Sequence, residues 1–168
     1  ARVLSEPMGK ALGQSIIVTN KPGAATNIGA DSVARARADG YTILTGDTGT
    51  LAANPYLYKK LSYSAEKDFA SVGLLVRFPM LLVVNSTLPV KNYAEFLAWA
   101  KQQAQGVSYG TPGAGSPHHL AVELLREKSG LKFVHVPYRG SAPAVQDVVA
   151  GQLPFMFVDS AAGLQHVQ

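Results

Sequence analysis

The feature that most constrains the fold of this chain is the alternation of short apolar runs with capped helical stretches. Seven runs are rich in β-branched and aromatic residues and have the length of a buried strand: Ile16–Thr19, Tyr41–Leu44, Val72–Val76, Met80–Val84, Val107–Tyr109, Phe133–Val136 and Phe155–Val158. Strands that alternate with helices are buried together when the helices cover a largely parallel sheet. The pattern therefore predicts an α/β fold class, with a doubly wound, mostly parallel sheet and right-handed crossovers.

The helical stretches begin at residues that can cap a helix, and most of them end near glycine. Asn92 has Glu95 three positions later, which is the spacing of a capping box. Ser116 precedes Pro117, a residue that the first helical turn accepts. We expect helices from Asn27 to Ala38, from Asn92, from Ser116 to Gly130 and from Ser141 to Gly151. The chain also begins and ends within helical patterns, so we expect a fragment or a chain trimmed at both ends.

One joint interrupts the alternation of strands and helices. The runs Val72–Val76 and Met80–Val84 are separated only by Arg77-Phe78-Pro79, which leaves no room for a helix. We place a domain boundary there. Residues 1–77 are expected to form part of a first lobe whose first strand is missing, and residues 78–168 a second lobe whose C-terminal part is missing.

The composition fits a globular protein with small anionic partners better than a protein that binds nucleic acid. Of the 168 residues, 47% are hydrophobic and 15% are charged, so the chain has enough apolar mass for a core. The net charge is +4, but lysines and arginines occur in no run longer than a pair. They do not alternate with aromatic residues, as a surface that stacks bases requires. No apolar run reaches the roughly 18 residues of a membrane span.

Motifs for catalysis, cofactors and metals are missing from the sequence. It has no cysteine, which excludes thiolate chemistry and cysteine-based zinc sites. The stretch Gly113–His118 lacks the third glycine of a dinucleotide fingerprint, and neither a P-loop nor a Gly-x-Ser-x-Gly elbow occurs. His119 and Glu123 are four residues apart but have no third ligand, so a surface pair is the simpler interpretation, and His135 fits a core histidine. We expect no cofactor, no metal and no enzyme activity.

Four predicted strands or turns are followed by loops rich in glycine, serine and threonine. In an open α/β sheet, ligands bind beyond the carboxyl ends of the strands, where helix N-termini present unpaired amides. The four loops are Thr45–Thr50, Gly110–Ser116, Pro137–Ser141 and Asp159–Ser160. One such loop would most simply turn a corner. Four at equivalent places favour a site that holds an anion with backbone amides and hydroxyls.

Several short motifs occur together along the chain: Ala11–Gln14, Asn20–Ala24, Asn27–Ala30, Asp39–Thr42, Asn54-Pro55, Lys67–Phe69 and Val134–Ala144. In this combination the chain resembles, nearly end to end, the Bug/TctC-type receptors of tripartite tricarboxylate transporters, which are extracytoplasmic solute-binding proteins of bacteria. The resemblance implies a two-lobed periplasmic-binding-protein fold (a Venus flytrap of type II). It also implies a periplasmic protein, exported by a signal peptide that is not present in this chain.

The resemblance further implies what is bound and where. The ligand would be a small carboxylate (a dicarboxylate, a tricarboxylate, an acidic amino acid or an aromatic carboxylate), captured between the lobes and delivered to the membrane subunits of a transporter. The ligand-binding residues that it implies are Gly46, Asp47, Thr48, Gly49 and Thr50 in the first lobe, and Thr111, Gly113, Ala114, Gly115, Ser116, His118, Tyr138, Gly140, Ser141 and Asp159 in the second. Asp47 stands where the family more often has a small uncharged residue. Its carboxylate would either point away from an anionic ligand or pair with a ligand ammonium.

Two other functions would use the same features. An α/β enzyme acting on a small anionic substrate at helix N-termini needs a titratable group at the ligand, for which the candidates are Asp47, His118 and Asp159. An effector-binding domain of a transcription regulator shares the two-lobed fold but needs a helix-turn-helix upstream. We also expect the chain to self-associate through an unpaired sheet edge.

Overall fold

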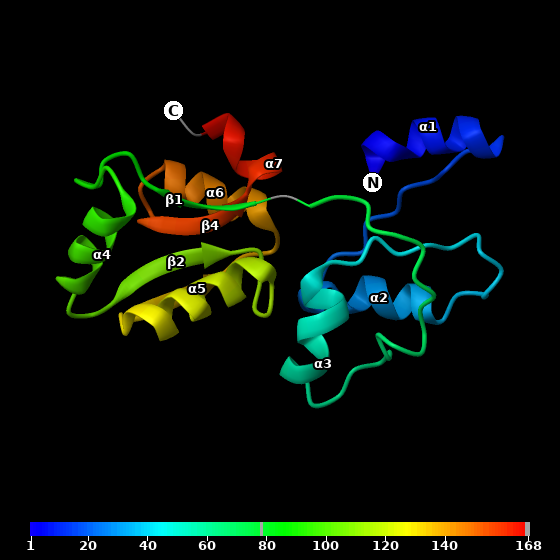
Figure 1. Cartoon of the computed structure of the whole chain (residues 1–168), viewed down its shortest axis with the longest axis horizontal. Coiled ribbons are helices and arrows are strands. Elements are labelled where there is room, and N and C mark those ends of the chain that lie inside the picture. Colours follow the sequence, from blue (N-terminus) through cyan, green and yellow to red (C-terminus); the bar gives the residue numbers. More distant parts are fainter. Residues whose placement is uncertain (78, 167–168) are drawn as a thin grey trace. The chain divides into compact units, whose positions relative to one another are not determined.

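The computed structural model describes residues 1–77 and 79–166, and the chain divides into two compact units, Ala1–Ala70 and Ser71–Gln168 (Figure 1). The second unit begins ahead of the boundary that the sequence suggested at residues 77 and 78. Phe78, at that suggested boundary, lies outside the described residues, as do the last two residues of the chain.

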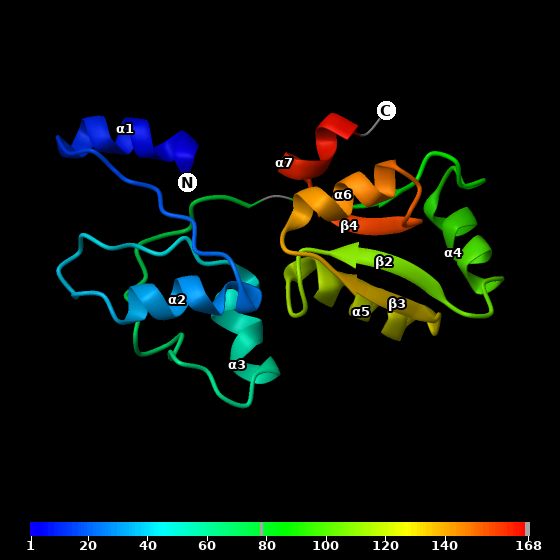
Figure 2. The same ribbon diagram turned by 180° about the vertical axis from the view of Figure 1, so that it is seen from behind.

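The second unit is built on a four-stranded sheet with the order β1-β4-β2-β3. Its strands are β1 (Met80–Val84), β2 (Val107–Thr111), β3 (Phe133–Pro137) and β4 (Phe155–Asp159). Strand β2 lies between β4 and β3 and is parallel to both (Figure 2). Strand β1 pairs antiparallel with β4 at one edge of the sheet. A short helix, α7 (Ser160–Gly163), and a 3-10 turn (Leu164–His166) follow β4. Of the five strands expected in this unit, the four from Met80 onward form, and the mostly parallel α/β sheet is confirmed.

Helices cover both faces of this sheet because apolar side chains alternate along its strands. Phe155 and Met156 are consecutive, fully buried residues of β4 that point to opposite faces. On the side of Phe155 the core includes residues of α4 (Tyr93–Lys101) and α5 (Pro117–Ser129). On the side of Met156 it includes residues of α6 (Ser141–Val149). The second unit therefore has two apolar layers, one on each face of the sheet.

Helices α4 and α5 of this unit begin after side chains that cap them. The side chain of Asn92 accepts the amide of Glu95 at 3.0 Å, and the Glu95 carboxylate accepts the amide of Lys91 at 2.7 Å. Helix α5 begins after Ser116 and ends at Gly130, which takes the left-handed conformation with φ 68°. These boundaries were predicted from the sequence.

The first unit contains helices joined by extended segments. Its helices are α1 (Arg2–Leu12), α2 (Asn27–Ala34) and α3 (Asn54–Leu57), with helical turns at Ala24–Thr26 and Gly49–Ala53. Helix α2 ends at Ala34, before the predicted Ala38. Its N-cap position is occupied by Thr26 and not by Asn27. The prediction was wrong there because the Asn27 side chain accepts hydrogen bonds from Asn54 and Tyr63 instead. None of the described helices is both long and apolar enough to cross a membrane.

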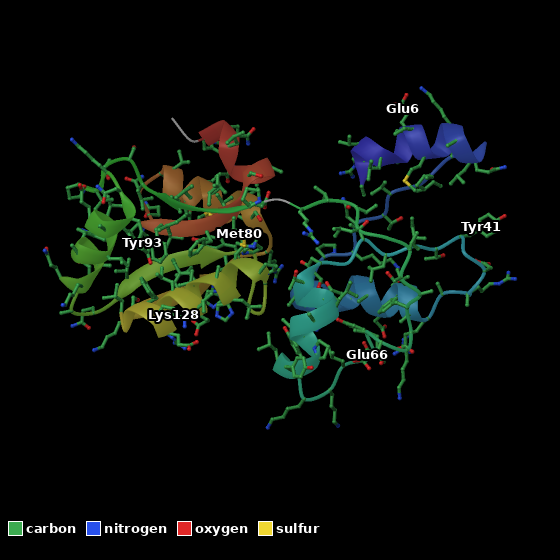
Figure 3. The ribbon with its side chains drawn as sticks, in the orientation of Figure 1. Glu6, Tyr41, Glu66, Met80, Tyr93 and Lys128 are labelled. Atoms are coloured by element: carbon green, nitrogen blue, oxygen red, sulfur yellow. The ribbon has the colours of Figure 1, made fainter. Side chains whose placement is uncertain are left out.

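Three of the predicted strands do not form in the described residues: Ile16–Thr19, Tyr41–Leu44 and Val72–Val76. Ile17 is 87% exposed and Val72 is 92% exposed, and Tyr41 projects from its segment in Figure 3. A strand needs a neighbour to complete its hydrogen-bonded ladder as well as apolar side chains. No described segment pairs with these three runs, so they stay extended and unpaired.

Candidate functional site

Three loops of the second unit leave the sheet at the carboxyl ends of neighbouring parallel strands. Strand β2 ends at Thr111, β3 at Pro137 and β4 at Asp159, and β2 lies between the other two. Because these strands are parallel, their carboxyl ends lie at the same edge of the sheet. The structure thus brings the second-lobe residues that the sequence suggested to one edge of one sheet.

The loop that follows β2 is folded on itself by hydrogen bonds. The buried hydroxyl of Thr111 accepts the amide of Gly113 at 3.2 Å, and Nδ1 of His119 accepts the amide of Gly115 at 3.2 Å. Gly113 and Gly115 have φ angles of 147° and 79°, which L side chains rarely adopt. Ala114 is exposed at the tip of this loop, and no acceptor for its amide is found among the described residues. The Ala114 amide is therefore the loop donor that is open to a ligand.

Ser116 fixes the amino end of α5 next to this loop. Its hydroxyl oxygen accepts the amide of His119 at 3.3 Å, and its carbonyl accepts the amide of Leu120 at 3.0 Å. A hydroxyl that accepts one bond still has its own proton to donate. Ser116 can therefore cap α5 and donate to an anion at the same time, at the positive end of the helix dipole.

His118 and Asp159 bring the start of α5 next to the turn between β4 and α7. Nε2 of His118 lies 3.6 Å from Oδ2 of Asp159, and the two side chains are 11% and 18% exposed. The other carboxylate oxygen of Asp159 accepts the amide of Ala162 at 2.9 Å, as the cap of α7. One side of the Asp159 carboxylate is thus used by the backbone, and the other faces the imidazole.

The loop that follows β3 is attached to the loop after β2 through the backbone. The amide of Tyr138 donates to the carbonyl of Thr111 at 2.9 Å, and the amide of Gly140 donates to the carbonyl of Pro112 at 3.3 Å. The Tyr138 hydroxyl donates to the carboxylate of Asp147 in α6. That hydrogen bond is the main cause that raises the pKa of Tyr138 to about 12. The side chain of Tyr138 therefore supports this loop. Ser141, half-buried at the start of α6, supplies a second hydroxyl group at the end of the loop.

Two histidines that were not among the predicted site residues, His119 and His135, lie against the loop after β2. The rings of His119 and His135 are stacked with their centroids 4.2 Å apart. The ring of the buried Tyr109 lies 5.1 Å from that of His135. His135 Nε2 is 2.6 Å from the hydroxyl oxygen of Thr111. The sequence carried no signal for the contact between the two histidines, because it depends on how α5 packs on β3.

Burial lowers the pKa of both histidines below its ordinary value. For His119, the nearby Glu123 carboxylate opposes the effect of burial and Arg126 adds to it. For His135, the charge of a protonated His119 lowers the pKa further, and Glu123 opposes this. Burial is also the largest cause that raises the pKa of Tyr109, whose hydroxyl donates to Glu123 at 3.3 Å. At neutral pH the stacked pair is therefore uncharged.

In the first unit, the predicted loop Gly46–Thr50 is closed by its own side chains. Oδ1 of Asp47 accepts both the amide and the hydroxyl of Thr50 at 2.7 Å. The hydroxyl oxygens of Thr26 and Thr50 are 2.5 Å apart, which joins this loop to the segment before α2. Sequence reasoning missed Thr26 as a neighbour of the predicted site.

The segment before α2 has an unusual backbone and a buried support. Ala24, Ala25 and Thr26 have φ angles of 46°, 48° and 73°, in the left-handed region that non-glycine residues seldom occupy. The fully buried Asn54 donates to the carbonyl of Ala25 at 2.9 Å and to Oδ1 of Asn27 at 2.8 Å. These bonds hold the strained segment in place.

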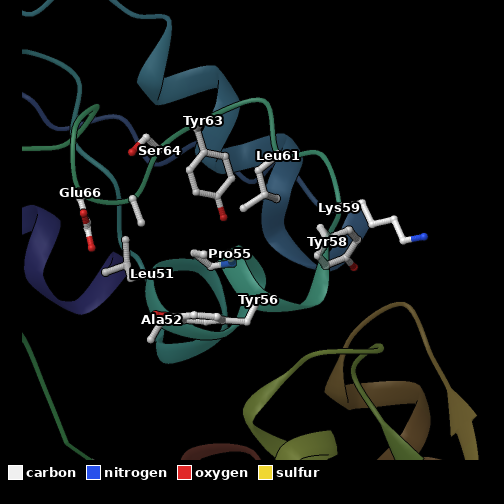
Figure 4. Close-up of a pocket in the computed structure, with 11 residues that line it drawn as sticks. Leu51, Ala52, Pro55, Tyr56, Tyr58, Lys59, Leu61, Tyr63, Ser64 and Glu66 are labelled. Atoms are coloured by element: carbon white, nitrogen blue, oxygen red, sulfur yellow. The ribbon is translucent and has the colours of Figure 1, made fainter.

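A hollow in the first unit does not coincide with the predicted site. It has a volume of about 600 Å³ and is walled by α3 and the segment that follows it, with Tyr56, Tyr58 and Tyr63 around it (Figure 4). None of the predicted residues Gly46–Thr50 lines it. Across the described part of the chain, no three His, Asp or Glu side chains come together as ligands for a metal ion.

The chain is similar to known proteins over nearly its whole length. A family model described as "Tripartite tricarboxylate transporter family receptor" matches residues 1–168. The solved structure of R. palustris Rpa4515 with adipate is 34% identical, with a TM-score of 0.92 over 96% of this chain and 54% of that one. The periplasmic binding protein BugD is 34% identical, with a TM-score of 0.91 over 99% and 55%. MatC from Rhodopseudomonas palustris with bound malate is 32% identical, with a TM-score of 0.88 over 99% and 57%.

The chain spans about half the length of the curated relatives that it matches. Two relatives that are 38% identical to it are covered over 47% and 48% of their own length. The similarity to the solved structures shows that the fold is that of periplasmic solute-binding proteins.

Proposed function

The chain belongs to the tripartite tricarboxylate transporter receptor family, and from that premise we propose that it binds a small dicarboxylate at the strand-end loops of its second unit. The family consists of solute-binding receptors, so the prediction that the chain is not an enzyme is confirmed at the level of the family. What remains to be proposed is the ligand, its contacts and the partner that receives it.

The observation that carries the proposal is the convergence of three loops at one edge of the sheet, next to the amino ends of two helices. Helix α5 has 13 residues and α6 has nine, and both begin at this edge. The exposed amide of Ala114 and the hydroxyls of Ser116 and Ser141 are donors without a fixed positive charge. A carboxylate held by such donors at helix N-termini needs no buried counter-ion.

His118 and Asp159, the titratable residues at this edge of the sheet, are arranged in a way that suits ligand binding. The Asp159 carboxylate would repel an anion, but one of its oxygens accepts the Ala162 amide and the other faces the His118 imidazole. An imidazole carries at least one N–H, which His118 can direct toward a ligand carboxylate. That the loop Gly46–Thr50 of the first unit also binds the ligand stays a prediction.

The ligand class follows from the relatives. Rpa4515 is described with adipate and MatC with bound malate, and both ligands carry two carboxylates. We extend that class to this chain, together with delivery to the membrane subunits of a transporter and a periplasmic location. The family description and the periplasmic binding protein BugD support the last two.

Isothermal titration calorimetry with adipate and with malate tests the proposal, with their uncharged diamides as control compounds. We expect binding of at least one acid and no binding of either diamide. His118→Ala is expected to weaken binding about tenfold, because it removes the imidazole N–H that would donate to the ligand carboxylate. Lys128→Ala, at the other end of α5, removes a charge far from the loops and should leave the affinity unchanged. Failure of every carboxylate in a panel of di- and tricarboxylates to bind would contradict the proposal.

A further inference from the structure

Two stacked histidines each hold one part of the loop Thr111–Ser116. His119, in the first turn of α5, accepts the amide of Gly115 through Nδ1 at 3.2 Å. His135, in β3, places Nε2 2.6 Å from the hydroxyl oxygen of Thr111. Their ring centroids are 4.2 Å apart, with 26° between the ring planes. Both imidazoles therefore form part of the support of the loop that is proposed to bind the ligand.

We infer that the protonation of His119 releases the Gly115 amide and loosens this loop, so that acid weakens the binding of an anion there. The statement about anion binding rests on the proposed function, whereas the statement about the loop does not. The reason lies in the lone pair of Nδ1. A neutral imidazole with its proton on Nε2 can accept the Gly115 amide, but an imidazolium carries a proton on both nitrogens and accepts nothing. The amide of Gly115 then loses its partner within the fold.

Among the described residues, Glu123 is the acidic group that lies near the pair. Its Oε1 lies 3.8 Å from Nε2 of His119, which is longer than a hydrogen bond. The same carboxylate is paired with Arg126 on α5 and accepts the hydroxyl of Tyr109 on β2. Because Arg126 already balances its charge, Glu123 only partly compensates a proton on His119.

The two histidines differ in how well the loop tolerates their protonation. The hydroxyl of Thr111 lies 3.2 Å from the carbonyl of Gly113, so it can turn its proton there and accept from a charged His135. His119 has no such alternative, because the Gly115 amide cannot reverse its direction. The 4.2 Å stack also disfavours two charges at once. The loop is therefore sensitive to the proton on His119 in particular.

Nuclear magnetic resonance of the chain without ligand tests the statement about the loop. The ring signals of His119 and the amide signal of Gly115 are followed from about pH 7.5 to about pH 5, the range in which a histidine changes its charge. We expect the Gly115 amide to shift and to exchange faster with water at the same midpoint as the His119 ring. His119→Asn keeps an acceptor near the position of Nδ1 without a titrating group, and should abolish the shift. His166→Asn, an exposed histidine outside the loop, is the matched control and should not.

Calorimetry with adipate at both ends of the pH range tests the consequence for binding. We expect the affinity of the wild-type chain to fall about tenfold more than that of His119→Asn, and the comparison cancels the protonation of adipate itself. A Gly115 amide that does not respond when His119 is protonated would overturn the inference. An equal loss of affinity in the two proteins would overturn its second part. If no carboxylate of the panel binds while Gly115 still follows His119, the proposed function fails and the coupling of His119 to the loop stands.

Discussion

Asp47 accepts two hydrogen bonds from Thr50, one from the amide and one from the hydroxyl, both at 2.7 Å. Of the two orientations that the sequence left open for Asp47, this geometry favours the one in which the carboxylate is turned to its own loop. Thr50 is buried, and its carbonyl accepts the hydroxyl of Tyr63 at 2.8 Å. The charge of Asp47 thus helps to hold a turn that is anchored in the first unit.

We expect Asp47→Ala to lower the free energy of unfolding by about 1 kcal/mol, because two donors of Thr50 lose their acceptor. Asp47→Asn keeps an oxygen acceptor and should retain most of the stability. Urea unfolding followed by circular dichroism measures both. If Asp47 only shapes its loop, Asp47→Ser should leave the ratio of the affinities for aspartate and succinate unchanged. A change in that ratio would favour the pairing of Asp47 with a ligand ammonium instead.

Tyr138→Phe removes the hydroxyl that donates to Asp147 and keeps the ring. We expect a loss of about 1–2 kcal/mol, because a hydrogen bond to a charged group is lost from a partly buried site. The pKa of Tyr138 is raised to about 12 in the folded chain, so the folded state binds this proton more tightly than the unfolded one. The stabilisation is therefore complete below pH 10 and is lost as the pH rises through the folded value. Tyr93→Phe, at an exposed site in α4, is the control and should cost almost nothing.

Gly110 in β2 has no space for a side chain. An added Cβ would lie 2.9 Å from Cδ1 of Leu153 and 3.2 Å from Cβ of Ala144. We expect Gly110→Ala to destabilise the chain by about 1–3 kcal/mol, as overpacking of a core does. Gly73→Ala meets nothing within 4 Å and should be close to neutral. Thermal unfolding of the two variants checks this, and equal melting temperatures would contradict it.

Acid should destabilise the chain through its buried histidines. Burial lowers the pKa of His119 and of His135 in the folded state, so the unfolded chain binds these protons more tightly. Their contribution to stability is therefore complete above the unfolded value of about 6.5 and is lost as the pH falls through the folded values. Urea unfolding at a series of pH values should show a smaller acid loss for His135→Gln than for the wild type. An unchanged loss would mean that other groups cause it.

The exposed apolar runs predict that the chain self-associates. Ile17, Val72 and Val76 lie in extended segments whose backbone pairs with no neighbour in the described residues. Such segments can add to a sheet edge of another chain. We expect size-exclusion chromatography with light scattering to show a dimer or larger species, and Val72→Lys with Val76→Lys to reduce it. A clean monomer of the wild-type chain would contradict this expectation.

Local signals in the sequence predicted the four strands of the sheet and the helices that cover its two faces. Each strand there is an apolar run of the right length, and each of the helices α4 and α5 has capping residues whose bonds depend on neighbours along the chain. The parallel order of the sheet followed from the alternation of strands and helices, because crossover connections allow few other arrangements. The same alternation of strands and helices predicted which loops follow the carboxyl ends of the strands.

Strand pairing and side-chain contacts between residues distant in the sequence could not be predicted from local signals. The runs Ile16–Thr19 and Val72–Val76 have the same composition as true strands, but they are exposed because a strand also needs a neighbour for its hydrogen bonds. The stack of His119 on His135 arises where a helix packs on a strand, and no spacing along the chain encodes it. Local sequence signals therefore located the strands of the sheet and its capped helices, whereas packing between distant segments selected which apolar runs pair and which side chains support the loops.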